Sequence, residues 1–246
     1  MAALAAEMAL KAQTALAHHP AKADGSPVTD VDLAIETRLR DELRSARPED
    51  AILGEEFGRA GQGDRVWIID PVDGTAHYIA GREDWGTHVA LQASGDVVLG
   101  VVTRPARETT WYATRDGGAF VLSSSSATPS RLDMPTSPSA GRPRIAVWEK
   151  EGGTLASALS ARFSIVPSTL DAILHVAEGR LDGVVDVSGR PWDHAPYARL
   201  IEEAGGRFSD RFGQRCIDDG LVCYSRSDIH DGLLELIARY GQSGGT

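Results

Sequence analysis

The feature that most constrains the fold is the run WIIDPVDGTAHYIAG at residues 67–81. Its apolar and β-branched residues predict a buried strand over 65–69, and Pro71 is expected to end that strand. Asp70 then lies at the strand end, and Asp73 follows shortly after it. A turn fixed by proline directs both carboxylates at one centre, which predicts a chemical site at this edge of a sheet.

The same turn carries groups that suit an anion. Gly74 lets backbone amides approach closely, and Thr75 offers a hydroxyl beside them. A simple Asx-Pro turn is the alternative, and it is the better interpretation of a D-P-x-D sequence alone. Acids elsewhere in the chain therefore decide between a site and a turn.

Two further acids follow or begin predicted elements. Glu55 lies in GEE at 54–56, after an apolar pair, and Asp193 lies in PWDHAPYARLIEEAGG at 191–206, where a helix is expected to start. Asp193 alone would equally fit a helix N-cap. With the two acids of the proline turn, they form a set of hard oxygen ligands without histidine or cysteine. Such a set suits Mg²⁺, with Mn²⁺ as the alternative, rather than zinc.

The charge of the chain restricts its partners. The 35 acidic and 25 basic residues give a formal charge of −10, which repels a nucleic-acid polymer. The same field opposes an anionic substrate unless bound cations reverse its sign locally. We therefore expect a small anionic molecule to bind together with metal ions.

Other features predict a cytoplasmic protein. No run approaches the roughly 18 apolar residues of a membrane span, so no membrane partner is expected. Glu7 and Lys11 interrupt the apolar N-terminal segment, which favours an amphipathic helix over a signal peptide. Cys216 and Cys223 are expected to be free thiols in a reducing compartment, with a disulfide as the alternative.

Periodicity and turn residues predict the elements along the chain. Helices are expected at 3–17, 30–45, 170–178, 194–204 and 229–239. Strands are expected at 65–69, 88–92, 97–103, 109–114, 144–148, 163–166, 183–187 and 221–224. Gly95 and Asp96 supply a hairpin turn between two of these strands. Residues 123–143, rich in serine, proline and threonine, are expected to form a surface connection or a subdomain boundary.

The order of these elements favours one compact unit of two halves. Antiparallel strand pairs dominate residues 1–135, which are expected to form an α+β subdomain with most of the metal ligands. Residues 140–246 alternate strands and helices, which predicts an α/β subdomain that carries Asp193 and the substrate side. The predicted fold class is therefore α+β with an α/β half.

Three separated motifs agree in order and spacing with one family. GEE, DPVDGT at 70–75 and PWDHAPYARLIEEAGG together resemble the inositol monophosphatase superfamily, from about residue 22 to near the C-terminus. The resemblance implies a layered αβαβα sandwich, a metal-dependent phosphoric monoester hydrolase and sensitivity to lithium. It also implies two or three Mg²⁺ ions and a homodimer.

The resemblance further implies a role for each motif residue. The expected metal ligands are Glu55, Asp70, the carbonyl of Val72, Asp73 and Asp193. The amides of Gly74 and Thr75 are expected to hold phosphate oxygens, while Glu55 and Thr75 orient the attacking water. A metal pair makes this attack possible near neutral pH and stabilises the entering and leaving oxygens.

Two residues near the second predicted helix match supporting positions of the family. Asp32, in SPVTDVDLAIE at 26–36, is expected to act in catalysis by supporting the weakest metal ion and its waters. Lys22 matches a basic position near it. An acid in the first turn of a helix is also common for dipole reasons alone.

The motifs around the expected alcohol pocket point to more than one substrate. The segments RPEDAILGEEFG, WYATRDGGAF and HVAEGRLD resemble histidinol-phosphate phosphatases. Ser168 and Thr169 look more like inositol monophosphatases, since the histidinol branch usually carries Gly-Asp there. Asp186 matches a substrate-contacting acid that accepts hydrogen bonds from hydroxyl or ammonium groups. We expect these three residues to line the pocket.

Other segments are similar to 3′-phosphoadenosine phosphatases, namely GREDWGTHVAL at 81–91 and TRPAR at 103–107. His77 and Tyr78 replace the Asn-Phe pair that is usual after the proline turn, and His77 is expected to shape the pocket rim rather than bind metal. The segment 143–166 is shorter than in most relatives, which opens the pocket or trims a dimer contact.

The predicted function is Mg²⁺-dependent hydrolysis of the phosphate monoester of a small hydroxylated metabolite. Histidinol phosphate, or an inositol or sugar phosphate, is the expected substrate. The alternatives are 3′-phosphoadenosine 5′-phosphate as substrate and, in a different class, a catalytically silent relative that binds a phosphorylated ligand. Every metal-ligand position of the motifs is intact, which speaks against the silent relative.

Overall fold

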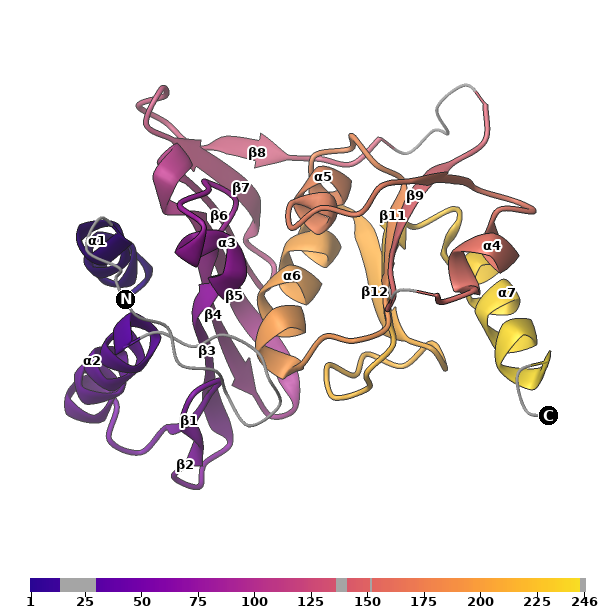
Figure 1. Ribbon diagram of the computed structural model, residues 1–246. Helices are drawn as coiled ribbons and strands as arrows, with labels where there is room; N and C mark the ends of the chain where they lie inside the picture. Colours follow the sequence, from indigo (N-terminus) through magenta and orange to yellow (C-terminus); the bar gives the residue numbers. More distant parts are fainter. Residues whose placement is uncertain (14–29, 136–140, 151, 244–246) are drawn as a thin grey trace.

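The computed structural model describes residues 1–13, 30–135, 141–150 and 152–243. Within them, five layers of helices and sheets alternate across the molecule (Figure 1). The predicted αβαβα sandwich is therefore confirmed. Lys22 and the end of the first predicted helix, 14–17, lie outside the described residues.

The first sheet, as described, has eight strands in the order β2-β1-β3-β4-β5-β6-β7-β8. They are β1 (Ala51–Gly54), β2 (Gly58–Ala60), β3 (Arg65–Asp73), β4 (Gly86–Ala93), β5 (Asp96–Arg104), β6 (Thr109–Thr114), β7 (Gly118–Ser123) and β8 (Ser130–Leu132). β1 runs parallel to β3, and the other neighbouring pairs are antiparallel. The 3₁₀ turn η1 (Pro105–Arg107) joins β5 to β6.

Helices α1 (Ala2–Gln13) and α2 (Asp30–Ala46) form the outer layer beside this sheet (Figure 1). Ile35 and Leu39 lie one turn apart on the buried face of α2 and are fully buried. They share an apolar cluster with Ile69 and Val72 of β3. The cluster anchors the end of β3 that carries the proline turn.

Strand β3 is longer than predicted. It continues through Pro71 to its end at Asp73, with a break in register on the way. Proline is tolerated there because β1 pairs with β3 only as far as Ile69, so no ladder partner is lost on that side. The turn comes instead at Gly74, whose φ of 78° leads into the short helix α3 (Thr75–Ile79).

Three more predictions for the first half need correction. The hairpin turn lies one residue earlier than expected, at Ser94 and Gly95, which both have positive φ. Strands β2 and β7 are not predicted, because β2 is short and both begin with glycine, so neither shows a clear alternation of apolar and polar residues. Residues 123–143 are more than a connection, since β8 within them pairs with β7 and extends the sheet.

The second sheet, as described, has five strands in the order β10-β9-β11-β13-β12. They are β9 (Arg144–Trp148), β10 (Ser164–Val166), β11 (Gly183–Asp186), β12 (Gly206–Asp210) and β13 (Val222–Arg226). Helices α4 (Leu155–Leu159) and α7 (His230–Ser243) cover its outer face (Figure 1). The sequence pattern does not predict β12 or α4, whereas the other strands of this half agree within a few residues.

Helices α5 (Ala172–Ala177) and α6 (Pro191–Glu203) lie between the two sheets (Figure 1). α6 approaches β5 closely because Gly100 has no side chain: a Cβ there would stand 2.3 Å from the carbonyl oxygen of Pro196. α6 begins at Pro191, earlier than predicted, since proline at the first helical position loses no hydrogen bond. Asp193 therefore lies inside the first turn of α6.

Two predictions about the whole chain can be compared with the structure. Cys216 and Cys223 are free thiols, as predicted. Among the described residues, none of the helices combines the length and the apolar character that a membrane crossing requires.

Candidate active site

Asp70 of β3 lies in the interior of the protein. Its side chain is 1% exposed, and its Oδ1 atom has no hydrogen-bond partner within the described parts of the chain. Leaving a buried carboxylate oxygen without a partner costs free energy, because the atom has lost its hydration. A cation beside Oδ1 would remove that cost.

The GEE loop is held in place by α2. Glu36 of α2 is fully buried, and its carboxylate accepts hydrogen bonds from the amides of the two residues after Glu55, at 2.8 and 3.2 Å. Gly54 makes room for this contact, because a Cβ there would stand 2.0 Å from Oε1 of Glu36. The loop fixed in this way places Glu55 beside Asp70, whose pKa it raises through charge and a hydrogen bond.

Asp193 enters the same site from the second half of the chain. Its Oδ2 atom accepts a hydrogen bond from the amide of Arg190 at 2.6 Å, within a capping box at the start of α6. The N-cap is thus Arg190 rather than Asp193, the alternative that the sequence left open, and Asp193 caps the helix from its third position. This capping contact occupies only one carboxylate oxygen, so a ligand role for the other is compatible with it.

The clustered carboxylates raise the pKa of two of their members. Burial raises the pKa of Asp70 well above its ordinary value, and the charges of Glu55, Asp73 and Asp193 add to that effect. Burial and the charge of Asp73 also raise the pKa of Asp193, to about 8, although the amide of Arg190 works in the opposite direction. Four converging acids of this kind fit hard divalent cations such as Mg²⁺ or Mn²⁺, which supply the missing positive charge.

Asp73 has different neighbours. Its Oδ2 atom lies 3.3 Å from Nε2 of His88 and 3.4 Å from Nη1 of Arg104. Burial works to raise the pKa of Asp73, but His88, Arg104 and His77 together lower it below its ordinary value. Asp70, Asp73 and His88 offer ligand atoms within 4.8 Å of one another. The site thus includes a histidine that the predicted set of carboxylates lacks.

Thr75, the first residue of α3, connects β3 to α2. Its hydroxyl lies 3.0 Å from the carbonyl oxygen of Val72 and 3.5 Å from Oδ1 of Asp32. Asp32 is 1% exposed. Gly74 is required at the turn, since a Cβ there would stand 2.7 Å from Cδ1 of Leu170 and its φ is positive. The structure therefore brings the predicted phosphate-binding and catalytic residues to the edge of the carboxylate cluster.

A cavity of about 180 Å³ opens beside the cluster, between the two halves. Asp73 and His88 line it from the first half, while Asp186 and Asp193 line it from the second. Its apolar wall consists of Trp148, Leu170 and Ile173. The cavity therefore joins the carboxylates to a surface that suits the non-phosphate part of a small molecule.

Asp186 ends β11 at this cavity. Its Oδ1 atom accepts hydrogen bonds from the amides of Ser188 at 2.9 Å and Gly189 at 3.2 Å. The described contacts of Asp186 include no ion pair with the nearby Arg190. Asp186 therefore shapes its own turn through Oδ1 while it lines the cavity.

The remaining predicted substrate residues, Ser168 and Thr169, are not among the residues that line the cavity. Ser168 and Thr169 are exposed, and the hydroxyl of Ser168 donates to the carbonyl oxygen of Val147 at 2.6 Å. Leu170 follows them directly and lines the cavity. His77, which is expected to shape the pocket rim, lies 2.8 Å from Asp84 and is not among the residues that line the cavity.

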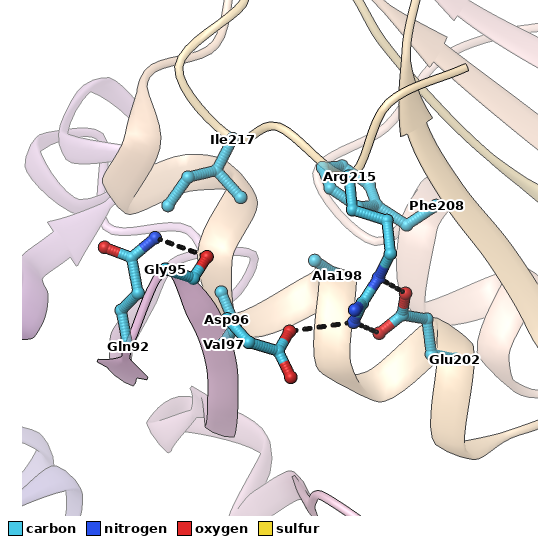
Figure 2. A pocket seen from close by; sticks show the side chains of 9 residues that line it. All are labelled: Gln92, Gly95, Asp96, Val97, Ala198, Glu202, Phe208, Arg215 and Ile217. Atoms are coloured by element: carbon cyan, nitrogen blue, oxygen red, sulfur yellow. Dashed lines mark hydrogen bonds and ion pairs between the residues drawn. The ribbon is translucent and has the colours of Figure 1, made fainter.

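A second hollow lies between the β4–β5 hairpin, α6 and the segment that precedes β13 (Figure 2). Arg215 crosses it, with an ion pair to Glu202 at 2.6 Å and another to Asp96 at 2.9 Å. Its volume of about 20 Å³ holds little more than one water molecule. This hollow is therefore too small for a substrate, and its ion pairs serve to join α6 to the hairpin.

Comparisons with known proteins agree with this geometry. The model of the inositol monophosphatase family matches residues 1–242. A histidinol-phosphatase of Streptomyces coelicolor is 34% identical over 224 residues, which cover 87% of this chain and 84% of that protein. A Streptomyces griseus protein named glucose-1-phosphate thymidylyltransferase is 38% identical over 231 residues, which cover 89% of this chain and 86% of that protein.

A solved structure supports the same assignment. An IMPase of Thermotoga maritima has a TM-score of 0.83 and 25% identity, and the match covers 98% of this chain and 95% of that one. The resemblance carried by the three motifs is therefore confirmed along nearly the whole chain. The protein belongs to the inositol monophosphatase family and is a phosphoric monoester hydrolase.

Proposed function

We propose that the protein hydrolyses the phosphate monoester of a small hydroxylated metabolite and requires Mg²⁺ to do so. The observation that carries the proposal is the buried Oδ1 atom of Asp70, which has no hydrogen-bond partner among the described residues, within a cluster of acids that raise its pKa. Such an oxygen suits a cation, and the family to which the chain belongs acts on phosphate esters. Mn²⁺ is the alternative ion.

The proposed ligands of two or three Mg²⁺ ions are Glu55, Asp70, the carbonyl of Val72, Asp73 and Asp193. When bound, these ions activate water and neutralise the charge of the phosphate. The amides of Gly74 and Thr75 hold phosphate oxygens. Glu55 and Thr75 orient the attacking water, and Asp32 supports Thr75 across the 3.5 Å between them.

The side chains that line the cavity favour a substrate alcohol with a planar or apolar part and a cationic group. Trp148, Leu170 and Ile173 offer the apolar wall, and Asp186 offers a negative charge. Histidinol phosphate combines these properties, so we place it ahead of an inositol or sugar phosphate. Ser168 and Thr169, which directly precede Leu170 of this wall, stay proposed substrate contacts.

The alternatives fit less well. Adenosine 3′,5′-bisphosphate would bring a second dianion toward Asp186, and a cavity of about 180 Å³ is small for a nucleotide. A catalytically silent relative would have no use for a complete set of ligands. Inhibition by Li⁺ and a homodimer remain proposals from the family resemblance, and a cytoplasmic location remains a proposal from the sequence composition.

A phosphate-release panel tests the substrate. The purified protein with Mg²⁺ is given histidinol phosphate, an inositol monophosphate, glucose 1-phosphate and adenosine 3′,5′-bisphosphate in parallel. The highest kcat/KM is expected for histidinol phosphate. Release of pyrophosphate from dTTP and glucose 1-phosphate, without release of phosphate from any ester, would point instead to the activity for which the Streptomyces griseus relative is named.

A further inference from the structure

Arg104, the last residue of β5, is fully buried beside the candidate active site. Its guanidinium reaches Asp171 Oδ1 at 2.9 Å, the Leu170 carbonyl at 3.0 Å, the Tyr197 hydroxyl at 3.2 Å, the Thr103 carbonyl at 3.3 Å and Asp73 Oδ2 at 3.4 Å. Thr103 lies on β5 itself, and the other partners come from β3, from the residues just before α5 and from α6. One side chain therefore ties Asp73 to both halves of the protein.

The path of Arg104 depends on a glycine in the strand between it and Asp73. β4 lies between β3 and β5 in the sheet, and Gly86 of β4 is opposite Asp73. A Cβ at Gly86 would stand 2.4 Å from Nη1 of Arg104. The missing side chain leaves the space through which the guanidinium crosses β4 and reaches Asp73.

His88, two residues further along β4, contacts the same oxygen of Asp73. Its Nε2 atom lies 3.3 Å from Oδ2 of Asp73 and 3.2 Å from the hydroxyl of Tyr197. Two nitrogens from neighbouring strands therefore lie at Oδ2. This leaves Oδ1 as the oxygen of Asp73 that is available for a cation.

We propose that Arg104 is a positioning residue for Asp73: together with His88 it holds Oδ2 and so turns Oδ1 toward the cation site. The inference rests on the proposed function, because it gives Asp73 a metal-binding role. Groups that hydrogen-bond to a metal ligand fix its orientation, and their loss commonly weakens metal binding by about ten- to a hundred-fold. The planar fork of arginine matters here, since lysine places one point charge where arginine satisfies several acceptors.

Arg104→Lys tests the proposal while keeping the positive charge. The matched control is Arg199→Lys. Arg199 of α6 is also buried and makes comparable contacts, to the Val97 carbonyl at 2.7 Å and to Asp96 at 3.1 Å, but none of its partners is a proposed metal ligand. Both variants lose a buried guanidinium, so a general loss of packing affects them alike.

The readout is the dissociation constant for Mn²⁺ itself, measured on the chelated proteins from the paramagnetic resonance signal of free Mn²⁺. We expect Arg104→Lys to weaken binding by about ten-fold or more, and Arg199→Lys to leave the constant within about two-fold of wild type. Equal constants for the two variants would overturn the positioning role. A wild-type protein that binds no Mn²⁺ would instead contradict the proposed function.

Asp171→Asn keeps the test decisive if Arg104→Lys does not fold. It removes the charge that pairs with Arg104 at 2.9 Å without altering a proposed metal ligand. Weaker Mn²⁺ binding in this variant, in the same direction as for Arg104→Lys, is expected. Unchanged Mn²⁺ binding would contradict the proposal. Pulsed electron paramagnetic resonance supplies a second check. Coupling between bound Mn²⁺ and an imidazole nitrogen would also contradict the proposal, because His88 would then bind the metal instead of holding Asp73.

Discussion

Gly86 faces the guanidinium of Arg104, so closely that a Cβ on Gly86 would stand 2.4 Å from Nη1. The same Cβ would stand 1.9 Å from the carbonyl oxygen of Thr103. The backbone φ of Gly86 is not among the positive values, so the requirement for glycine is one of space rather than of conformation. A residue outside the family motifs thus decides whether an arginine reaches a proposed metal ligand.

Gly86→Ala should therefore destabilise the protein and weaken Mn²⁺ binding together. Overpacking at a buried site costs about 1–3 kcal/mol, because neighbouring atoms must shift. Thermal unfolding and the Mn²⁺ dissociation constant measure the two effects. Gly220→Ala is the control, since a Cβ there meets only an ordinary contact at 3.9 Å. Tight Mn²⁺ binding by Gly86→Ala would show that Arg104 does not need this space.

Asp73→Asn should leave a folded protein with kcat reduced by roughly a hundred-fold or more. The change replaces a charged ligand by a neutral amide at the centre that stabilises the transition state. Steady-state kinetics at saturating Mg²⁺ measure the loss. Asp96→Asn removes a carboxylate paired with Arg215 outside the cavity and should keep near-normal kcat (Figure 2). A near-normal kcat in Asp73→Asn would remove Asp73 from the site.

The chelated protein should lose stability as the pH rises from about 7.5 to 8.5. Burial and neighbouring acids raise the pKa of Asp193 to about 8, so the native state holds a proton that the unfolded chain has already released. Stability then falls with pH through the folded pKa, by on the order of 1 kcal/mol for this group. Burial lowers the pKa of His175, His194 and His230, and their opposite contribution ends about one unit above the unfolded histidine pKa of about 6.5, below the pH range tested.

Denaturant unfolding in EDTA across this pH range measures the slope. Asp193→Asn should reduce it, because asparagine keeps the acceptor for the amide of Arg190 but carries no titrating proton, while Asp70, whose pKa is also raised, still contributes. Millimolar Mg²⁺ should raise wild-type stability most at pH 8, since a ligand that binds only the native state stabilises it by mass action. A wild-type slope that Asp193→Asn leaves unchanged would mean that Asp193 is not the titrating group.

Much of the site has a local signature in the sequence, and that part is predictable. Asp70, Asp73, Glu55 and Asp193 lie at strand ends and a helix start, where short motifs specify both the acid and its turn. The length of β3 is not predictable in this way. Pro71 is tolerated only because β1 has already ended, which depends on the register between two strands.

The positions of His88 and Arg104 at the site are not predictable from the sequence for the same reason. Each follows a threonine near one end of a largely apolar strand, and only the order β3-β4-β5 brings them to Asp73. The sequence does not predict that Leu170 lines the cavity either, since an apolar residue before a helix normally belongs to the hydrophobic core. The sequence feature that relates to this contact is the presence of Gly86 and Arg104 in neighbouring strands. Their relation can be recognised only once the pairing of the strands is known.

Asp186→Asn should raise KM for the natural substrate while sparing an aryl phosphate such as p-nitrophenyl phosphate. Asparagine still accepts from the amides of Ser188 and Gly189, so the turn is kept and only the charge is lost. An interaction with the alcohol is lost only by substrates that possess it. The kcat/KM values of both substrates are compared.

Asp210→Asn is the matched control for this change. Asp210 also ends a strand and accepts from two amides of its own turn, those of Phe212 and Gln214, both at 2.8 Å. It does not line the active-site cavity. An equal loss for both substrates in Asp186→Asn, or an equal effect of Asp210→Asn, would assign Asp186 to structure rather than to recognition.

Phosphate release before and after removal of divalent cations tests the central claim most directly. The protein is dialysed against EDTA, and its turnover of histidinol phosphate and p-nitrophenyl phosphate is measured as Mg²⁺ is added back. Activity should vanish on chelation and return with Mg²⁺, while Ca²⁺ should not restore it, because its larger radius and looser coordination misplace the reacting groups. Full activity after exhaustive chelation would contradict a mechanism built on Asp70, Asp73 and Asp193 as metal ligands.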